Sequence, residues 1–341
     1  MNQEIFSGHR FSRDLSTYVN GGSFSRKDFL ISILSQANPF NRYAGIICRQ
    51  YMKRRDSLPD GISPVFDIKI EVYKGRNSSV HRMMEYLSAV KNDLVGAYVH
   101  GSLGTYEEVA FSDFDALVIL GDEVFKAPDR LAEVARKINK ARAIMFDFDP
   151  LQHHGWFVLT ESDLNFYPEY YFPVELFRHA KSLFPDKGLT LNIRVQDSSD
   201  KIHQAFHDLS HGVKGLLTKR RFPKDMYQLK ILLSQFMLLP ALYVQLRDQK
   251  GIFKKFSFEA ARVDFSDGDW SIMTEVSSLR KNWYYRISSS RRLLITKPTA
   301  ISRFLARRWA PSIPGGMKKV LTDDFYQRML VLVTRMRRNL Q

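Results

Sequence analysis

The sequence contains a single cysteine, Cys48, among 341 residues. One cysteine excludes an internal disulfide and is typical of a reducing compartment. The chain also opens without the basic and then apolar pattern of a secretion signal. We therefore expect a cytoplasmic protein.

Long apolar runs are scarce too. The longest, 231–246, includes Pro240 and is shorter than the roughly 20 residues that span a bilayer. We expect it to form a core helix, kinked or broken at Pro240, and we expect no transmembrane segment. The sequence also has no Walker A loop, no dinucleotide-binding glycine pattern and no serine-hydrolase elbow.

Acidic residues are rare near the C-terminus. The chain carries a formal net charge of +15, and residues 280–341 contain fifteen Lys or Arg but only two acids. Aromatic residues such as Trp283, Tyr284 and Trp309 lie among these basic residues, which favours an anionic partner such as a nucleic acid or a nucleotide. Two alternatives stay open: a peripheral contact with an acidic membrane, or the solvated basic rim of a core helix.

The most informative segment is 100–120, which reads HGSLGTYEEVAFSDFDALVIL. A Gly101-Ser102 turn follows the apolar run 94–99, and ten residues later Asp113 and Asp115 flank Phe114 ahead of a second apolar run. Strand alternation would place both carboxylates on one face. Side-by-side carboxylates can hold one or two divalent cations against a triphosphate, and a glycine turn lets backbone N–H groups approach phosphates.

This segment resembles the DNA polymerase beta-like nucleotidyltransferase superfamily, over roughly residues 94–120. The resemblance implies an α+β fold with a small mixed β-sheet core and helices around it, and the sequence pattern beyond residue 167 predicts a mostly helical C-terminal domain after it. It also implies that Gly101 and Ser102 bind the triphosphate, and that Asp113 and Asp115 bind Mg²⁺, or Mn²⁺ in its place. The implied reaction transfers a nucleoside monophosphate from a triphosphate to an acceptor, with release of pyrophosphate.

The family usually supplies a third carboxylate from a later strand. The strand expected at 156–159 contains no acid. Asp149 is the predicted third catalytic acid and metal ligand, and Asp147 is its alternative, because both precede that strand on one face of an alternating segment. His154 is a further contender, as a metal ligand or base.

A second feature resembles nucleotidyltransferases of the oligoadenylate-synthetase and cyclic-nucleotide-synthase kind. Those proteins carry a helical Lys and, later, a Ser at the start of another helix, and both touch the triphosphate. Lys230 and Ser257 match, with Ser257 as an expected helix N-cap. The alternative is a solvated Lys and an ordinary cap.

We expect three zones along the chain. Residues 1–77 form an N-terminal extension with a helix at 28–37 and a strand at 65–73. Residues 78–166 form the catalytic core, with one helix capped by Asn77 or Ser78 and another over 128–140. Residues 167–341 form an almost wholly helical domain that ends in the basic segment 280–341.

The sequence leaves the acceptor open. The basic C-terminal segment favours an anionic acceptor, meaning RNA or a second nucleotide, over the cationic drugs that antibiotic-modifying members accept. Two other functions remain: a catalytically inactive basic module that binds RNA or nucleotides, and a glycosyltransferase that uses Asp113 and Asp115 on a sugar nucleotide.

Overall fold

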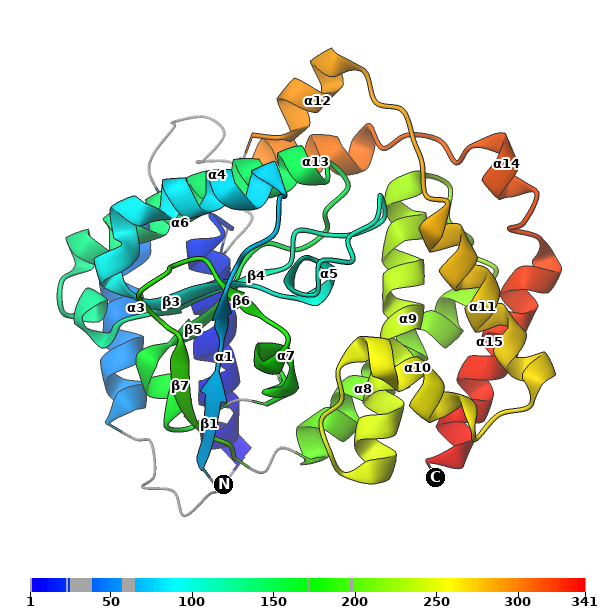
Figure 1. The fold of residues 1–341 in the computed structure, drawn as a ribbon, viewed down its shortest axis with the longest axis horizontal. Helices are drawn as coiled ribbons and strands as arrows, with labels where there is room; N and C mark the ends of the chain where they lie inside the picture. The colour runs from blue at the N-terminus through cyan, green and yellow to red at the C-terminus, as the bar shows by residue number, and fades with distance from the viewer. Residues whose placement is uncertain are drawn as a thin grey trace.

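A five-stranded mixed sheet lies at the centre of one half of the molecule in this computed structural model (Figure 1). The structure describes residues 2–22, 24, 39–56, 65–167, 169–170, 172–196, 199–297 and 299–340. The strand order is β2-β6-β3-β4-β5, with β3 antiparallel to β4 and β6, and with β4 parallel to β5. The strands are β2 (Glu71–Val72), β3 (Leu94–Val99), β4 (Ala116–Leu120), β5 (Phe157–Thr160) and β6 (Lys181–Ser182).

Strand β4, which lies between β3 and β5, is buried on both faces, and all five of its residues are apolar. Ala116, Val118 and Leu120 pack into a core shared with helices, whereas Leu117 and Ile119 face a second, smaller core. The helices of the first core are α1 (Asn2–Val19), α3 (Pro39–Arg55), α4 (Ser78–Leu87) and α6 (Pro128–Phe148). The second core includes the antiparallel pair of β1 (Val65–Lys69) and β7 (Thr190–Arg194).

Short helical segments connect these elements. They are η1 (Ser88–Asp93), α5 (Gly101–Gly104), η2 (Asp122–Lys126), η3 (Glu161–Leu164) and α7 (Glu175–Arg178). Residues 2–196 are called the sheet half below, and residues 199–340 the helical half.

The helical half has its own apolar core. Its helices are α8 (Ser199–Thr218), α9 (Met226–Asp248), α10 (Lys254–Arg262), α11 (Asp267–Lys281), α12 (Ser289–Ile295), α13 (Ala300–Arg308), α14 (Gly315–Lys318) and α15 (Asp323–Asn339). Phe111 and Leu151 of the sheet half enter this core. Phe111 lies two residues before Asp113, and Leu151 lies two residues after Asp149. The contact between the halves is therefore close to the predicted site.

Helix α9 confirms the core helix predicted for 231–246, although Pro240 lies inside the helix without ending it. By length and composition α9 is the one described helix that is apolar enough to cross a membrane, and 67% of its apolar window is buried within the protein. A mostly buried apolar helix is what the core of a helical bundle also requires.

The predicted α+β class, with a small mixed sheet followed by helices, is confirmed. So are the strand at 94–99 and the cap of α4, where the Asn77 side chain accepts from the Ser79 N–H at 3.0 Å. The zone boundaries at 77 and 166 stay predictions. The helix expected at 28–37 lies outside the described residues.

Strands β6 and β7 lie beyond residue 167, in a part of the chain that was expected to be almost wholly helical. Two other expectations were wrong. The segment 65–73 divides into β1 and β2, which pair with different strands. Helix α6 continues past 140 to Phe148, because Ile144 and Met145 extend its buried face. Asp147 therefore belongs to a helix, and Asp149 is extended because Pro150 follows it.

Candidate functional site

Asp113 and Asp115 were expected inside a strand. In the structure β4 begins at Ala116, so both acids lie in the segment just before it. The backbone of Phe114 between them is fixed by Gln152, whose amide oxygen accepts from the Phe114 N–H at 2.8 Å and whose amide nitrogen donates to the Phe114 carbonyl at 3.1 Å. The His100 N–H donates to the Asp115 carbonyl at 3.0 Å. Hydrogen bonds to Gln152 and His100 thus fix the backbone from which both carboxylate side chains extend.

The Gly101 turn packs against Asp115. Gly101 has a φ of +60°, and a Cβ at this position would lie 2.5 Å from the Asp115 Oδ2 atom. Only glycine fits here, because an L side chain would be both strained and in collision with the carboxylate. The structure therefore brings Gly101 and Asp115 together, with the half-buried Ser102 next in the chain, and the predicted contact of Gly101 and Ser102 with a triphosphate stays a prediction.

Two histidines face the carboxylates. The His154 Nε2 atom lies 3.0 Å from Asp115 Oδ1 and 3.9 Å from Asp113 Oδ2, and His153 Nδ1 lies 3.7 Å from Asp113 Oδ1. Burial would lower the pKa of His154, but its hydrogen bond to Asp115 and the charge of Asp113 raise it to about 9. In the absence of a bound cation, the His154 imidazolium compensates the two carboxylates.

Burial would also raise the pKa values of both carboxylates, yet neighbouring cations outweigh it. The charges of Lys230 and His154 hold the pKa of Asp113 well below its usual range. The hydrogen bond from His154 lowers the pKa of Asp115. Both groups are therefore ionised at neutral pH, the state in which a carboxylate binds a cation.

Lys230 lies beside Asp113 but is completely buried. Its Nζ atom is 2.5 Å from Asp149 Oδ2 and 3.1 Å from Asp113 Oδ1. Burial would lower the pKa of Lys230, but the two carboxylates raise it. The ammonium thus bridges Asp113 and Asp149, and the structure places it among carboxylates. Its predicted contact with a triphosphate stays a prediction.

Asp149 has both oxygens engaged. In addition to Lys230, its Oδ1 atom accepts from the Leu151 N–H at 3.1 Å and from the Tyr285 hydroxyl at 3.3 Å. Burial raises the pKa of Asp149 to about 6, despite the opposing charge of Lys230. The structure therefore brings Asp149 to Asp113 through Lys230, and its predicted place as third ligand stays a prediction. Asp147 instead pairs with Arg82 at 2.8 Å.

Ser257 is not the helix cap that we expected. Helix α10 begins at Lys254, after the N-cap Phe253, so Ser257 lies one turn inside it. Its hydroxyl is buried and donates to the Lys254 carbonyl at 2.7 Å. The helix starts earlier because the buried Phe253 anchors its extended N-cap, which leaves Lys254 in the first turn.

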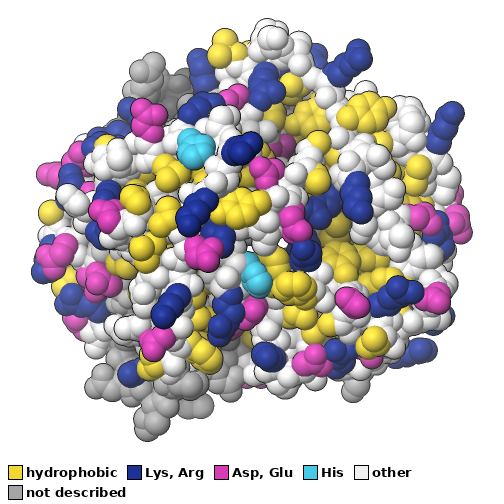
Figure 2. Space-filling view, in the orientation of Figure 1, with side chains coloured by type: hydrophobic (Ala, Val, Ile, Leu, Met, Phe, Trp, Pro, Cys, Tyr) yellow, Lys and Arg dark blue, Asp and Glu magenta, His cyan; other side chains and the backbone are white. Residues whose placement is uncertain are grey.

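Lys254 and Arg280 of the helical half interact electrostatically with the two carboxylates. Burial and the nearby Arg280 lower the pKa of Lys254 to about 8, while Asp115 and Asp113 act in the opposite direction. Burial likewise lowers the pKa of Arg280, which interacts with both carboxylates. Figure 2 shows a hollow between the two halves on this face, with Lys and Arg side chains along it.

No motif in the sequence marks Gln152, and Arg280 was expected only as part of the basic segment 280–341. Gln152 lies in an unremarkable polar stretch, and only the fold shows that it clamps the backbone between the two carboxylates. Arg280 comes from the end of α11, far from the motif in sequence. Lys254 carried a weak signal, since it lies three residues before Ser257, the residue that was proposed as a cap.

The donor set suits a hard cation that keeps water and phosphate ligands. Mg²⁺ is commonly bound by one or two carboxylates together with substrate phosphates. Asp113 and Asp115 meet that requirement. No cluster of three or more His, Cys, Asp or Glu able to hold a metal occurs among the described residues, so a cage of protein ligands alone is absent from that part of the chain.

Comparisons with known proteins give little further detail. No family model matches the sequence, and no curated protein matches it. Among solved structures, a spectinomycin adenyltransferase, AAD(9) from Enterococcus faecialis, solved with ATP and spectinomycin, aligns with 69% of this chain and 99% of its own. The identity is 12% and the TM-score 0.34, which is too low to carry an argument.

Proposed function

We propose that this chain is a nucleotidyltransferase that transfers a nucleoside monophosphate from a nucleoside triphosphate to an acceptor and releases pyrophosphate. One observation carries the proposal: two ionised carboxylates, Asp113 and Asp115, lie beside a glycine turn and face Lys254 and Arg280 across the contact between the halves. A triphosphate needs this combination of cation-binding acids and basic side chains.

In this proposal the acidic and the basic residues of the site have different roles. Asp113 and Asp115 would hold Mg²⁺, or Mn²⁺ in its place, which neutralises phosphate oxygens when bound. Lys254 and Arg280 supply positive charge for the remaining phosphates, and the N–H groups at Gly101 and Ser102 supply neutral donors. His154 compensates Asp113 and Asp115 until a cation takes its place.

Asp149 and Lys230 enter this proposal as positioning residues. Lys230 holds Asp113 from one side and is itself held by Asp149. Because the ammonium is fully buried, its contacts keep the Asp113 carboxylate in one orientation. Pre-positioning of this kind is what phosphoryl-transfer enzymes mainly supply.

We further propose an anionic acceptor, either RNA or a second nucleotide, because the basic segment 280–341 contributes Arg280 to the site. The second candidate function is a nucleotide-binding module without activity. The engaged oxygens of Asp149 favour it, because they leave only Asp113 and Asp115 as candidate cation ligands, whereas the family that segment 94–120 resembles uses three carboxylates.

The test supplies the purified protein with Mg²⁺ and each of the four α-³²P-labelled nucleoside triphosphates. Total RNA, unlabelled nucleotides and a small-molecule extract serve as separate acceptors. Transfer of label identifies the base and the acceptor class. Binding of triphosphate without transfer to any acceptor would instead establish the inactive module.

A further inference from the structure

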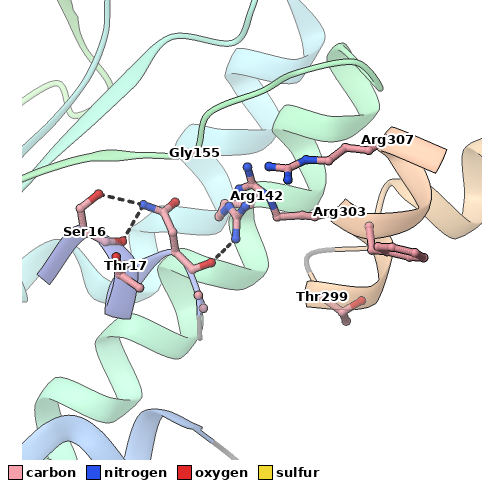
Figure 3. Close-up of a pocket in the computed structure, with 11 residues that line it drawn as sticks. Ser16, Thr17, Arg142, Gly155, Thr299, Arg303 and Arg307 are labelled. Carbon is pink, nitrogen blue, oxygen red and sulfur yellow. Dashed lines mark hydrogen bonds between the residues drawn. The ribbon is translucent and has the colours of Figure 1, made fainter. Parts of the chain in front are cut away.

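Arginines line a pocket between α1, α6 and α13 (Figure 3), and neither Asp113 nor Asp115 is among its lining residues. The pocket has a volume of about 590 Å³. Arg142 enters from α6, and Arg303 and Arg307 enter from α13. Ser16 and Thr17 of α1 add hydroxyl groups, and no acid is among the described residues that line it. The pocket therefore concentrates positive charge without an internal counter-charge.

Arg142 is the least satisfied of these side chains. It is 1% exposed, yet its Nε and Nη2 atoms have no hydrogen-bond partner. Its Nη1 atom donates to the Asn20 carbonyl and, at 2.9 Å, to Asn139 Oδ1. Burial and the neighbouring Arg303 lower the pKa of Arg142 to about 9. A buried guanidinium with unpaired N–H groups costs free energy, which an acceptor, preferably an anion, would offset.

Arg303 and Arg307 are each held by a hydrogen bond to a neighbouring residue. Arg303 donates to the His153 carbonyl at 3.1 Å, and the Arg307 Nε atom donates to the Tyr227 hydroxyl at 3.2 Å. Figure 3 shows both side chains reaching from α13 toward Arg142. These anchors hold like charges together, an arrangement that an anionic ligand stabilises.

We propose that this pocket binds a small molecule with two or more phosphoryl groups, at a site separate from Asp113 and Asp115. The guanidinium forks of the three arginines match phosphate oxygens in geometry as well as charge. The volume suits a ligand of nucleotide size. Gly155 lines the pocket and directly follows His154, which contacts Asp115, so a short segment of chain joins the two sites.

The probe is inorganic tripolyphosphate, titrated calorimetrically in the presence of EDTA so that no divalent cation recruits it to the carboxylates. Arg303→Gln and Arg307→Gln should each weaken binding roughly tenfold or more, since each removes a charge-assisted pair. Arg308→Gln is the matched control, because this exposed arginine is on the same helix but outside the pocket lining. Tyr227→Phe tests whether loss of the anchor alone explains the Arg307 result.

Binding that survives Asp113→Asn/Asp115→Asn and Arg308→Gln, but not Arg303→Gln or Arg307→Gln, supports the pocket whether or not the chain transfers nucleotides. Equal weakening by Arg308→Gln would assign the binding to diffuse surface charge and overturn the proposal. So would much tighter binding of a 5′-triphosphorylated RNA through the same arginines, because the ligand would then be an RNA end. Thermal unfolding of each variant without ligand checks that the fold is retained.

Discussion

Lys230 and Asp149 form a buried ion pair, with 2.5 Å between Nζ and Oδ2 and with side-chain exposures of 0% and 3%. The pair joins α9 of the helical half to the end of α6 in the sheet half. Lys230 also reaches Asp113 at 3.1 Å. The orientation of a proposed cation ligand thus depends directly on how the two halves pack.

Lys230→Met should destabilise the protein by about 3–5 kcal/mol, because it leaves Asp149 buried beside Asp113 without a counter-charge. Urea unfolding measures the change. The double variant Lys230→Met/Asp149→Asn should recover part of the lost stability, since it also removes the unpaired buried charge of Asp149. An unchanged urea midpoint for the single variant would contradict this account of the pair.

Gly101→Ala should abolish most transfer activity and cost roughly 1–2 kcal/mol in stability, because the new Cβ collides with Asp115 and the backbone is left-handed. Initial rates and denaturant unfolding measure the two effects. Gly212→Ala on α8 is the control: its Cβ would meet nothing within 4 Å, so we expect full activity and equal or greater stability. Similar activity in both variants would refute a close Gly101–Asp115 contact.

Arg280→Gln should weaken triphosphate binding by roughly tenfold, because it removes a cation that faces Asp113 and Asp115. Lys281→Gln, at the exposed neighbouring position, should leave the affinity within about twofold. Equilibrium binding of a non-hydrolysable triphosphate with Mg²⁺ gives both values. If the two substitutions have equal effects, Arg280 has no special place at the site.

Cys48 should react slowly with thiol reagents at pH 8 in the native protein. Its side chain is 6% exposed, and burial raises the pKa of its thiol to about 11, so little thiolate is present at that pH. In urea the thiol regains its ordinary pKa and should react in full at one group per chain. Timed reaction with a chromogenic disulfide measures both rates, and fast native labelling would show that α3 does not bury this residue.

The segment 94–120 was predictable because its signals are local. A glycine turn and an acidic pair ten residues later indicated a site in this segment, and the structure places Gly101 against Asp115, although β4 begins only after the acids. The setting of Asp149 was harder to predict. The segment before it alternates like a strand, but Ile144 and Met145 continue the buried face of the preceding helix, which ends at Phe148. Lys254 and Arg280 reach the carboxylates only through the packing of the halves, which no local pattern in the sequence records.

The central claim is that Asp113 and Asp115 together support nucleotidyl transfer. The most direct test is the initial rate of label transfer from an α-³²P triphosphate by Asp113→Asn, compared with Asp129→Asn at an exposed position on α6. We predict a loss of roughly a thousandfold or more for Asp113→Asn, with unfolding still cooperative, and no loss for Asp129→Asn. Equal transfer rates in the native protein and Asp113→Asn would contradict the proposed function.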